Sequence, residues 1–311
     1  MSHRSFHLYT KRAMSHVLTV IGAPGTSTLA PALIQAALGA LAEAGARPGE
    51  PDWLAPAEAC DIPFAGAAPE RAEAAVRARL GDAPVDLHAQ PAAGRRKALL
   101  VADMESTIIA EELLDILGDM AGIGPRIAAV TARAMAGELD FAAALTARVR
   151  LLAGQPASLL DAVRARITLN PGARTLVATM GAHGAHTALV SGGFTCFTEP
   201  VRAACGFDEA HGNRLLVANG ALSGEVGKPI LDRTAKETLL GTLAEPAAGG
   251  PAAACAVGDG ANDAAMVAAA GLGVAYRAKP VLRGAARVCI DHGDLTALLY
   301  LQGYRRRAFT D

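Results

Sequence analysis

From residue 98 onward, short apolar runs alternate with longer segments that carry apolar residues at helical spacing. This alternation constrains the fold more than any other feature of the sequence. Five runs predict strands, at 98–104, 186–193, 252–260, 271–277 and 287–290. Short buried strands that alternate with helices are typical of a parallel sheet with helices on both faces. We therefore predict an α/β fold with a doubly wound parallel sheet.

Two further regions complete the predicted organisation. Residues 110–168 carry no strand pattern and predict several helices, as a cap insertion over the strand ends at approximately 111–174. Residues 17–90 predict a small module with strand–helix–strand–helix–strand order, after a loose tail in which Met14 is an alternative start. The segment "PAAGRRK" reads as a linker. We therefore predict two domains, 1–92 and 93–311.

The composition gives no sign of binding to nucleic acid or insertion into a membrane. Lys and Arg number 29 and Asp and Glu number 30, so no basic excess points to nucleic acid or an anionic membrane. No apolar run reaches the roughly 18 residues of a membrane span. The five cysteines contain no C-x-x-C pair, which fits a reducing compartment. We expect a cytoplasmic protein that binds neither nucleic acid nor a membrane.

Four short stretches carry the polar residues that suit chemistry. They are "DMEST" at 103–107, "SGG" at 191–193, Lys236 in "DRTAKETLL" and "GDGAND" at 258–263. Each stretch alone is more often a turn or a solvated helix face. Three of them, however, end predicted parallel strands, whose carboxyl ends meet at one edge of a sheet. The sequence therefore predicts one site built from all four.

The residue types in these stretches suit phosphoryl transfer. A carboxylate such as Asp103 can attack phosphorus and form an aspartyl-phosphate. A second group must protonate the leaving oxygen and later activate water. Mg²⁺ prefers carboxylate oxygens, which Asp103 and Asp259 supply. Ser191, the Gly192 amide and Lys236 can bind the other phosphate oxygens.

The four stretches resemble the motifs of the haloacid dehalogenase superfamily. The segments "SGGFTCFTEPV", "VGDGANDAAMVAAAGLGVAYRAKP" and "MAGELDFAAALTARVRLL" are similar to its phosphoserine phosphatase family. The resemblance covers roughly residues 98–305 and implies a haloacid dehalogenase-like, Rossmann-type core with a helical cap. The N-terminal module resembles a small α+β ACT-like domain, which implies a homodimer as one expectation.

The resemblance also implies an activity and the residues that perform it. The activity is Mg²⁺-dependent hydrolysis of O-phospho-L-serine to L-serine and phosphate, the last step of serine biosynthesis. Asp103 would be the nucleophile and Glu105 the general acid and base. Asp103, Asp259 and the backbone carbonyl of Glu105 would bind Mg²⁺. The substrate phosphate would lie against Ser191, Gly192, Lys236 and Asn262.

The remaining implied roles concern orientation and substrate selection. Asp263 would orient the lysine that binds phosphate. In the cap, Glu112 would bind the substrate ammonium and Arg148 its carboxylate, since phosphoserine carries both charges. Met135 and Phe141 would wall the pocket.

One residue departs from the family pattern. The family has Asp where this chain has Glu105, which is longer by about 1.5 Å. An error of about 1 Å at a catalytic group can cost on the order of 100-fold in rate. Glu nevertheless has nearly the same pKa as Asp in solution and can transfer the same proton, so we expect an active enzyme. Two alternatives stay open: a phosphatase or phosphotransferase for another small phosphorylated amino acid or alcohol, and a non-catalytic serine sensor.

Overall fold

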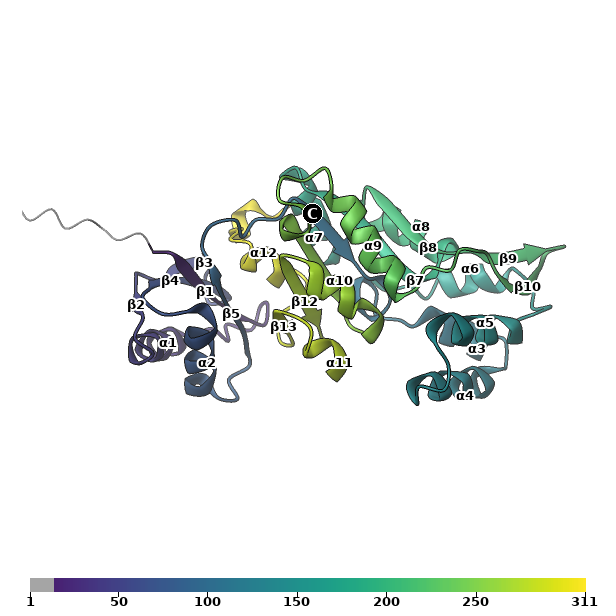
Figure 1. Ribbon diagram of the computed structural model, residues 1–311, viewed down its shortest axis with the longest axis horizontal. Helices are drawn as coiled ribbons and strands as arrows, with labels where there is room; N and C mark the ends of the chain where they lie inside the picture. Colours follow the sequence, from purple (N-terminus) through teal and green to yellow (C-terminus); the bar gives the residue numbers. More distant parts are fainter. Residues whose placement is uncertain (1–13) are drawn as a thin grey trace, which may run out of the picture. The chain divides into compact units, whose positions relative to one another are not determined.

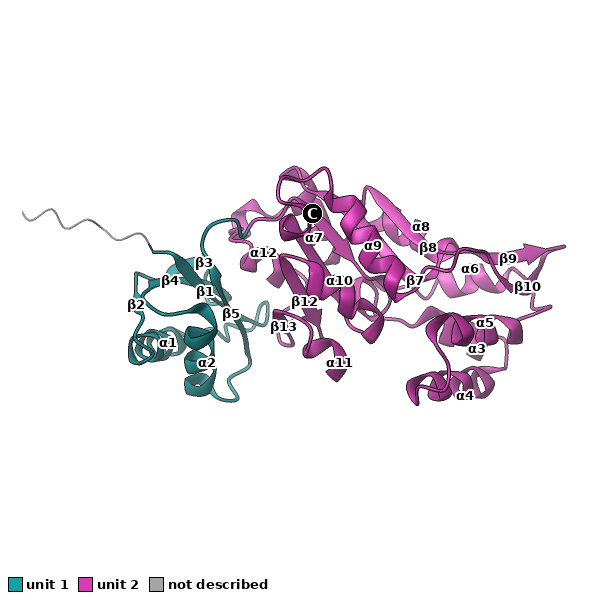
Figure 2. Ribbon diagram, viewed as in Figure 1, with its two compact units in different colours: residues 1–95 teal, residues 96–311 magenta. Residues whose placement is uncertain are grey.

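The computed structural model describes residues 14–311 (Figure 1). The tail expected before the first strand therefore lies, apart from its last residues, outside the described part of the chain. Two compact units divide the chain after Arg95, three residues beyond the predicted boundary at residue 92 (Figure 2). Each unit has its own cluster of buried apolar side chains.

The smaller unit is an antiparallel sheet with two helices. Its elements are β1 (His16–Gly22), α1 (Pro31–Glu43), β2 (Arg47–Pro48), β3 (Asp52–Ala55), β4 (Ala59–Ala65), α2 (Pro69–Leu80) and β5 (Val85–Pro91). The strand order is β2-β4-β1-β5, and β3 also pairs with β4. This is the ferredoxin-like β-α-β-β-α-β arrangement, in which β2 and β3 together stand for the second strand. The predicted order lacked this strand, because the prolines and glycine of "RPGEP" break its pattern.

The two helices of this unit start and pack as the sequence suggests. Pro31 and Pro69 each occupy the first turn, where their missing N–H has no helical partner to lose. The apolar faces of α1 and α2 cover one face of the sheet. The core between them includes Ile34, Leu41 and Val76 from the helices and Leu18, Val20, Ile62, Phe64 and Leu87 from the strands.

The larger unit contains the predicted parallel sheet. Its six strands are β6 (Leu99–Ala102), β7 (His186–Phe194), β8 (Glu209–Asn213), β11 (Ala254–Gly258), β12 (Leu272–Tyr276) and β13 (Val288–Ile290). They pair in the order β13-β12-β11-β6-β7-β8, all parallel. The doubly wound α/β prediction is therefore confirmed. The sequence missed β8, an edge strand whose "EAHGN" is polar because only part of it is buried.

Helices lie on both faces of this sheet. They are α7 (Ala173–Ala182), α8 (Thr195–Cys205), α9 (Arg233–Ala244), α10 (Ala264–Ala269), α11 (Pro280–Arg283) and α12 (Ala297–Leu301), with short turns η2 (Gly250–Ala253), η3 (Ala261–Asp263) and η4 (Arg306–Ala308). Side chains of α9 and α10 pack with those of β6 and β11, whereas α7 and α8 contact β7. Within the described residues, no helix combines the length and apolarity that a membrane span requires.

A helical cap is inserted after β6, as predicted. The turn η1 (Met104–Ile108) leads into α3 (Leu113–Met120), α4 (Gly124–Met135), α5 (Phe141–Leu151) and α6 (Leu159–Arg164), and we call α3–α6 the cap. In Figure 1, α3, α4 and α5 form a group beside the sheet. A hairpin of β9 (Leu215–Ala218) and β10 (Ala221–Val226), which the sequence did not predict, joins the cap through backbone hydrogen bonds to residues 154–157.

Two connections join the cap to the sheet, and they run side by side. Ile109, which follows η1, pairs with Leu169, which precedes α7. The side chain of Asn170 donates hydrogen bonds to the carbonyl oxygens of Thr107 (2.8 Å) and Ile109 (3.1 Å). Asn170 therefore links the two connections between the sheet and the cap. We call these connections, residues 107–110 and 168–170, the hinge.

Candidate active site

The register of the parallel sheet brings three loops to one edge. Ala102 of β6 lies between Leu189 of β7 and Val257 of β11. Because parallel strands run in one direction, the residues after these positions leave the sheet at the same edge. Those residues include Asp103, Ser191 and Asp259.

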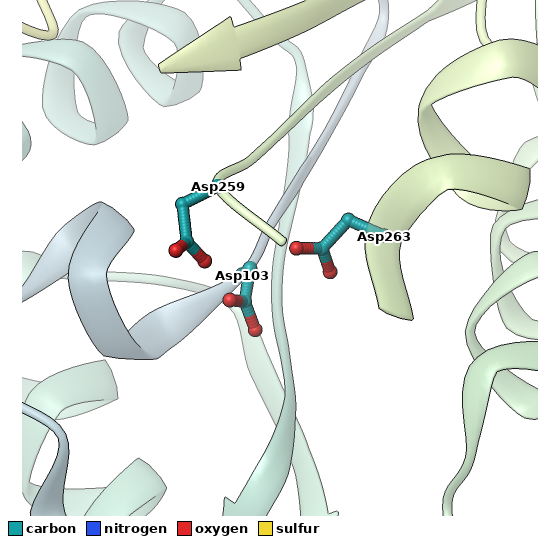
Figure 3. A group of neighbouring side chains, drawn as sticks. All are labelled: Asp103, Asp259 and Asp263. Atoms are coloured by element: carbon teal, nitrogen blue, oxygen red, sulfur yellow. The ribbon is translucent and has the colours of Figure 1, made fainter. Parts of the chain in front are cut away.

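Three carboxylates face one another at this edge (Figure 3). Asp103, Asp259 and Asp263 each offer an oxygen within 4.8 Å of the other two. None of the three residues is more than 6% exposed. Buried carboxylates at such distances repel one another, so the cluster needs positive charge.

A buried lysine supplies part of that charge. Lys236 lies on α9, whose amino end is capped by Asp232 through a hydrogen bond from the Ala235 N–H. The Lys236 Nζ lies 2.6 Å from an oxygen of Asp103 and 2.7 Å from one of Asp263. Burial raises the pKa of Asp103 well above its usual value, and the charge of Asp263 adds to this. Burial alone would lower the pKa of Lys236, but the two carboxylates raise it, so the lysine stays charged.

Both oxygens of Asp263 are engaged within the protein. One accepts from Lys236, and the other accepts from the backbone N–H of Gly260 at 3.1 Å. A Cβ at Gly258 would lie 2.5 Å from the Asp263 carboxyl carbon, so glycine is required for this packing. Asp263 thus lies where it can orient Lys236, and Asp103 and Asp259 remain as carboxylates for a cation.

The chain turns sharply at Glu105. Glu105 is extended and Ser106 has a φ of 56°, so no regular helix starts at this point, and the first cap helix begins only at Leu113. The Glu105 carboxylate reaches that helix and accepts the Leu113 N–H at 2.7 Å. A Cβ at Gly193 would lie 2.8 Å from the other Glu105 oxygen, so Gly193 makes room for the longer side chain.

The environment of Glu105 raises its pKa to about 7. Burial is the main cause, and the negative charge of Glu112 adds to it. The Leu113 N–H and the charges of Arg148 and Lys236 oppose the rise. A carboxyl group with a pKa near neutrality can both donate and accept a proton at physiological pH, as a general acid and base must.

The carboxyl-terminal part of β7 contacts the cap. Ser191, which is 1% exposed, accepts the Gly193 N–H at 2.9 Å through its hydroxyl. A Cβ at Gly192 would lie 2.8 Å from the ring of Phe141, so the first residue of α5 packs directly on this glycine. Asn213 of β8 donates to the Gly192 carbonyl at 2.8 Å and so holds the end of β7 in place; it was not predicted from the sequence.

The structure brings some of the predicted cap residues to the site and not others. Glu112 immediately precedes α3 and accepts the Ser106 hydroxyl at 2.8 Å. The buried Nε of Arg148 has no hydrogen-bond partner in the described chain. Met135, by contrast, is 82% exposed at the end of α4, so the expectation that it walls a pocket does not hold for this arrangement of the cap. Asn262 lies in η3 beside the carboxylate cluster and is partly exposed.

A charged residue of the site, Lys279, was also not predicted from the sequence. The Nζ of Lys279 lies 3.0 Å from an oxygen of Asp259 and 3.7 Å from one of Glu112. Lys279 lies three residues after the end of β12, so the rule used for the other strand ends also points to this segment.

The charge of the cluster favours a cation. When all are ionised, Asp103, Asp259 and Asp263 carry one more negative charge than Lys236 and Lys279 neutralise. The donors are all hard oxygens, and such groups suit divalent cations such as Mg²⁺, Ca²⁺ or Mn²⁺. The residues present therefore fit a divalent cation.

Comparisons with known proteins identify the family of this chain. A family model of haloacid dehalogenase-like hydrolases matches residues 100–268. The chain is 42% identical to a phosphoserine phosphatase of Streptomyces coelicolor over 81% of this chain and 62% of that protein, which is less than two thirds of its length. It is 40% identical to a phosphoserine phosphatase of Lactococcus lactis over 203 residues, 65% of this chain and 94% of that protein.

Solved structures give the same result. A hydrolase of this superfamily from Salmonella enterica serovar Typhi has a TM-score of 0.82 at 30% identity, over 93% of this chain and 98% of that one. A probable phosphoserine phosphatase from Vibrio cholerae has a TM-score of 0.75 at 30% identity, over 95% and 88%. A substrate-bound phosphoserine phosphatase has a TM-score of 0.62 at 35% identity, over 66% and 98%. The chain belongs to the haloacid dehalogenase-like hydrolases.

Proposed function

We propose that this protein is a Mg²⁺-dependent phosphatase that hydrolyses O-phospho-L-serine to L-serine and phosphate, the last step of L-serine biosynthesis. The observation that carries the proposal is the buried Asp103, held by Lys236 beside Asp259 at the carboxyl edge of a parallel sheet. The relatives with this activity support the choice of substrate.

The first step transfers the phosphoryl group to Asp103. A carboxylate oxygen of Asp103 attacks phosphorus, and the bond from phosphorus to the serine oxygen breaks. The carboxyl group of Glu105 gives its proton to the leaving serine oxygen. Lys236 stays charged and, with Ser191 and the Gly192 amide, binds the other phosphate oxygens.

The second step hydrolyses the aspartyl-phosphate. Glu105, now a carboxylate, removes a proton from water, and the oxygen of that water attacks phosphorus. The bond from phosphorus to the Asp103 oxygen breaks, which restores the carboxylate and releases phosphate. A pKa of about 7 lets Glu105 serve in both steps.

The cation would be held by Asp103, Asp259 and the backbone carbonyl of Glu105. When bound, Mg²⁺ neutralises negative charge on the phosphate and on the carboxylates around it. Asp263 is excluded from this set because its oxygens bind Lys236 and Gly260.

Charges of the cap would select the substrate. We assign the substrate carboxylate to Arg148, whose unpartnered Nε is a donor in need of an acceptor. The substrate ammonium is assigned to Glu112, and Phe141 would pack beside it. Asn262 would lie near the phosphate. Met135 would reach the substrate only in a more closed arrangement of the cap.

We further propose a cytoplasmic homodimer. The five cysteines contain no C-x-x-C pair, which suits a reducing compartment, and the ACT-like smaller unit offers a sheet for pairing. Sedimentation at micromolar concentration is expected to give a dimer, and a monomer would contradict this part of the proposal.

The test is phosphate release from O-phospho-L-serine, with and without Mg²⁺. Wild type should be active only with the cation, and Asp103→Asn should be inactive because an amide cannot form the acyl phosphate. Arg148→Ala should raise KM for phosphoserine by about tenfold or more, since a charged hydrogen bond is lost, with less effect on p-nitrophenyl phosphate.

Other outcomes favour the alternatives. Faster turnover of phosphothreonine or of an alcohol phosphate would favour a related phosphatase. Equal losses on both substrates in Arg148→Ala would show that Arg148 serves the chemistry or the fold. A wild-type protein that binds L-serine and hydrolyses none of these substrates would favour the sensor.

A further inference from the structure

Lys279 holds Asp259 through both its main chain and its side chain. The Lys279 N–H donates to the carbonyl oxygen of Asp259 at 2.9 Å. Its Nζ lies 3.0 Å from a carboxylate oxygen of the same residue. The main-chain bond fixes the start of the lysine side chain next to the carboxylate, so Lys279 is placed to pair with Asp259 whatever else the site binds.

The same Nζ also reaches the cap. It lies 3.7 Å from Glu112, the residue that precedes α3. The side chain of Asp259 is 9% exposed, whereas those of Lys279 and Glu112 are 60% and 49% exposed. Lys279 therefore spans from a buried carboxylate of the sheet edge to an exposed carboxylate of the cap.

The two lysines of the site differ in their freedom to move. Lys236 is 1% exposed and is bound by two carboxylates, so it cannot leave the cluster without losing both. Lys279 is largely in solvent and has a flexible four-carbon stem, so it can leave Asp259 at little cost. Of these two lysines, Lys279 is therefore the one that a cationic ligand of Asp259 can displace.

We propose that Lys279 is a positioning residue, a built-in positive charge that holds Asp259 in the metal-free protein and leaves it when a divalent cation binds there. The Nζ that is released stays within reach of Glu112, and a substrate ammonium on Glu112 would in turn displace it. The single ammonium group of Lys279 thus lies near both Asp259, where the divalent cation would bind, and Glu112, where the substrate ammonium would bind. This inference rests on the divalent-cation site of the proposed function.

Two possible roles of Lys279, competing with the cation or supporting the structure around Asp259, predict opposite effects of its removal on Mg²⁺ binding. If Lys279 competes with the cation for Asp259, then Lys279→Met should bind Mg²⁺ more tightly, by about two- to fivefold for an ion pair of this exposure. If Lys279 serves only to hold the Asp259 loop in place, the same variant should bind Mg²⁺ more weakly. Met keeps the length of the stem and the main-chain hydrogen bond.

The experiment is calorimetric titration of the metal-free protein, residues 1–311, with MgCl₂ alone. Lys279→Arg, which keeps the charge, should match wild type. Lys228→Met is the charge-matched control, because Lys228 is exposed and contacts none of the site carboxylates in the ion pairs of the described chain. Unchanged or weaker binding in Lys279→Met, or equal tightening in Lys228→Met, would overturn the inference.

Thermal unfolding with and without Mg²⁺ tests the same inference even if Lys279→Met is less stable than wild type. Without metal this variant should melt slightly below wild type, because the small contribution of the half-exposed ion pair to Asp259 is lost. Saturating Mg²⁺ should then raise its Tm by more than it raises that of wild type, since tighter binding stabilises more; an equal or smaller rise contradicts the inference. A wild type that binds Mg²⁺ but does not hydrolyse phosphoserine would count against the proposed function alone, whereas a wild type that binds no Mg²⁺ would overturn both.

Discussion

Among single residues, Glu105 is longer than the aspartate of the family motif by a methylene group, and this length lets its carboxylate reach two neighbours. One carboxylate oxygen meets the Leu113 N–H at the start of α3, and the other lies over Gly193. An aspartate, about 1.5 Å shorter, would not span both contacts. The sequence could identify the departure, but not its consequence, because the turn at Ser106 that directs Glu105 toward α3 has no clear signal in "DMEST".

This geometry predicts that Glu105→Asp will not improve the enzyme. The shorter side chain should lose the Leu113 hydrogen bond and hold the proton farther from the leaving oxygen, so kcat on phosphoserine should fall by about tenfold. Steady-state kinetics at saturating Mg²⁺ measure this. A large gain in kcat would mean instead that Glu105 is a tolerated flaw.

Glu105→Gln separates proton transfer from positioning. The amide oxygen can still accept the Leu113 N–H, but the side chain can neither give nor take the proton. With p-nitrophenyl phosphate, which has a good leaving group, the first step should still occur and the aspartyl-phosphate should accumulate. Mass spectrometry of the quenched protein should show a phosphorylated Asp103, and steady turnover by this variant would argue against Glu105 as the base.

The raised pKa of Glu105 predicts a pH dependence with a definite sign. Below about pH 7 the carboxyl group is protonated and can act as an acid; above it the group is a carboxylate. Therefore kcat/KM for phosphoserine should fall as the pH rises above about 7, because the serine oxygen needs the proton. The aryl phosphate should show no such fall, since p-nitrophenolate leaves without one. Identical alkaline limbs for the two substrates would contradict this assignment.

Among the elements, the connections between cap and sheet depend on long-range contacts that a local pattern does not contain. Asn170 was not identified from the sequence, because "NPG" there predicts an ordinary turn. Its side chain instead bonds to Thr107 and Ile109, some sixty residues earlier in the chain. The hairpin of β9 and β10 was missed for a similar reason, since it is stabilised by the cap rather than by the core.

We predict that Asn170→Ala loosens this hinge. Two carbonyl oxygens lose their donors, so amide hydrogens near residues 107–110 and 168–170 should exchange faster. Because the cap then closes less often over the substrate, KM for phosphoserine should rise by about three- to tenfold, with a smaller change in kcat. Asn170→Asp has the same size but no N–H donors and should behave alike. A variant with unchanged exchange and KM would show that the hinge does not depend on Asn170.

For the whole molecule, topology explains why a short list of residues could be placed from the sequence. Asp103 and Asp259 follow β6 and β11, and Ser191 lies near the end of β7. Because these strands are parallel and neighbouring, all three residues come to the same edge of the sheet. Residues of the cap were harder to place, because the position of a helical insertion depends on a hinge and not on strand register. Met135 illustrates this, since its helix was predicted but its side chain faces solvent.

The division after Arg95 predicts that residues 96–311 suffice for catalysis. All proposed site residues lie in this unit, which has its own apolar core. The Lactococcus relative aligns over 203 residues that make up 94% of it, so it has room for one such unit and little more. A chain of residues 96–311 should therefore unfold in one cooperative transition and hydrolyse phosphoserine with a kcat within about twofold of the value for residues 1–311. Asp103→Asn in the same truncated chain is the control for contaminating activity. Loss of most of the kcat in a folded truncated chain would show that the smaller unit contributes to the site, and aggregation would show that it is needed for folding.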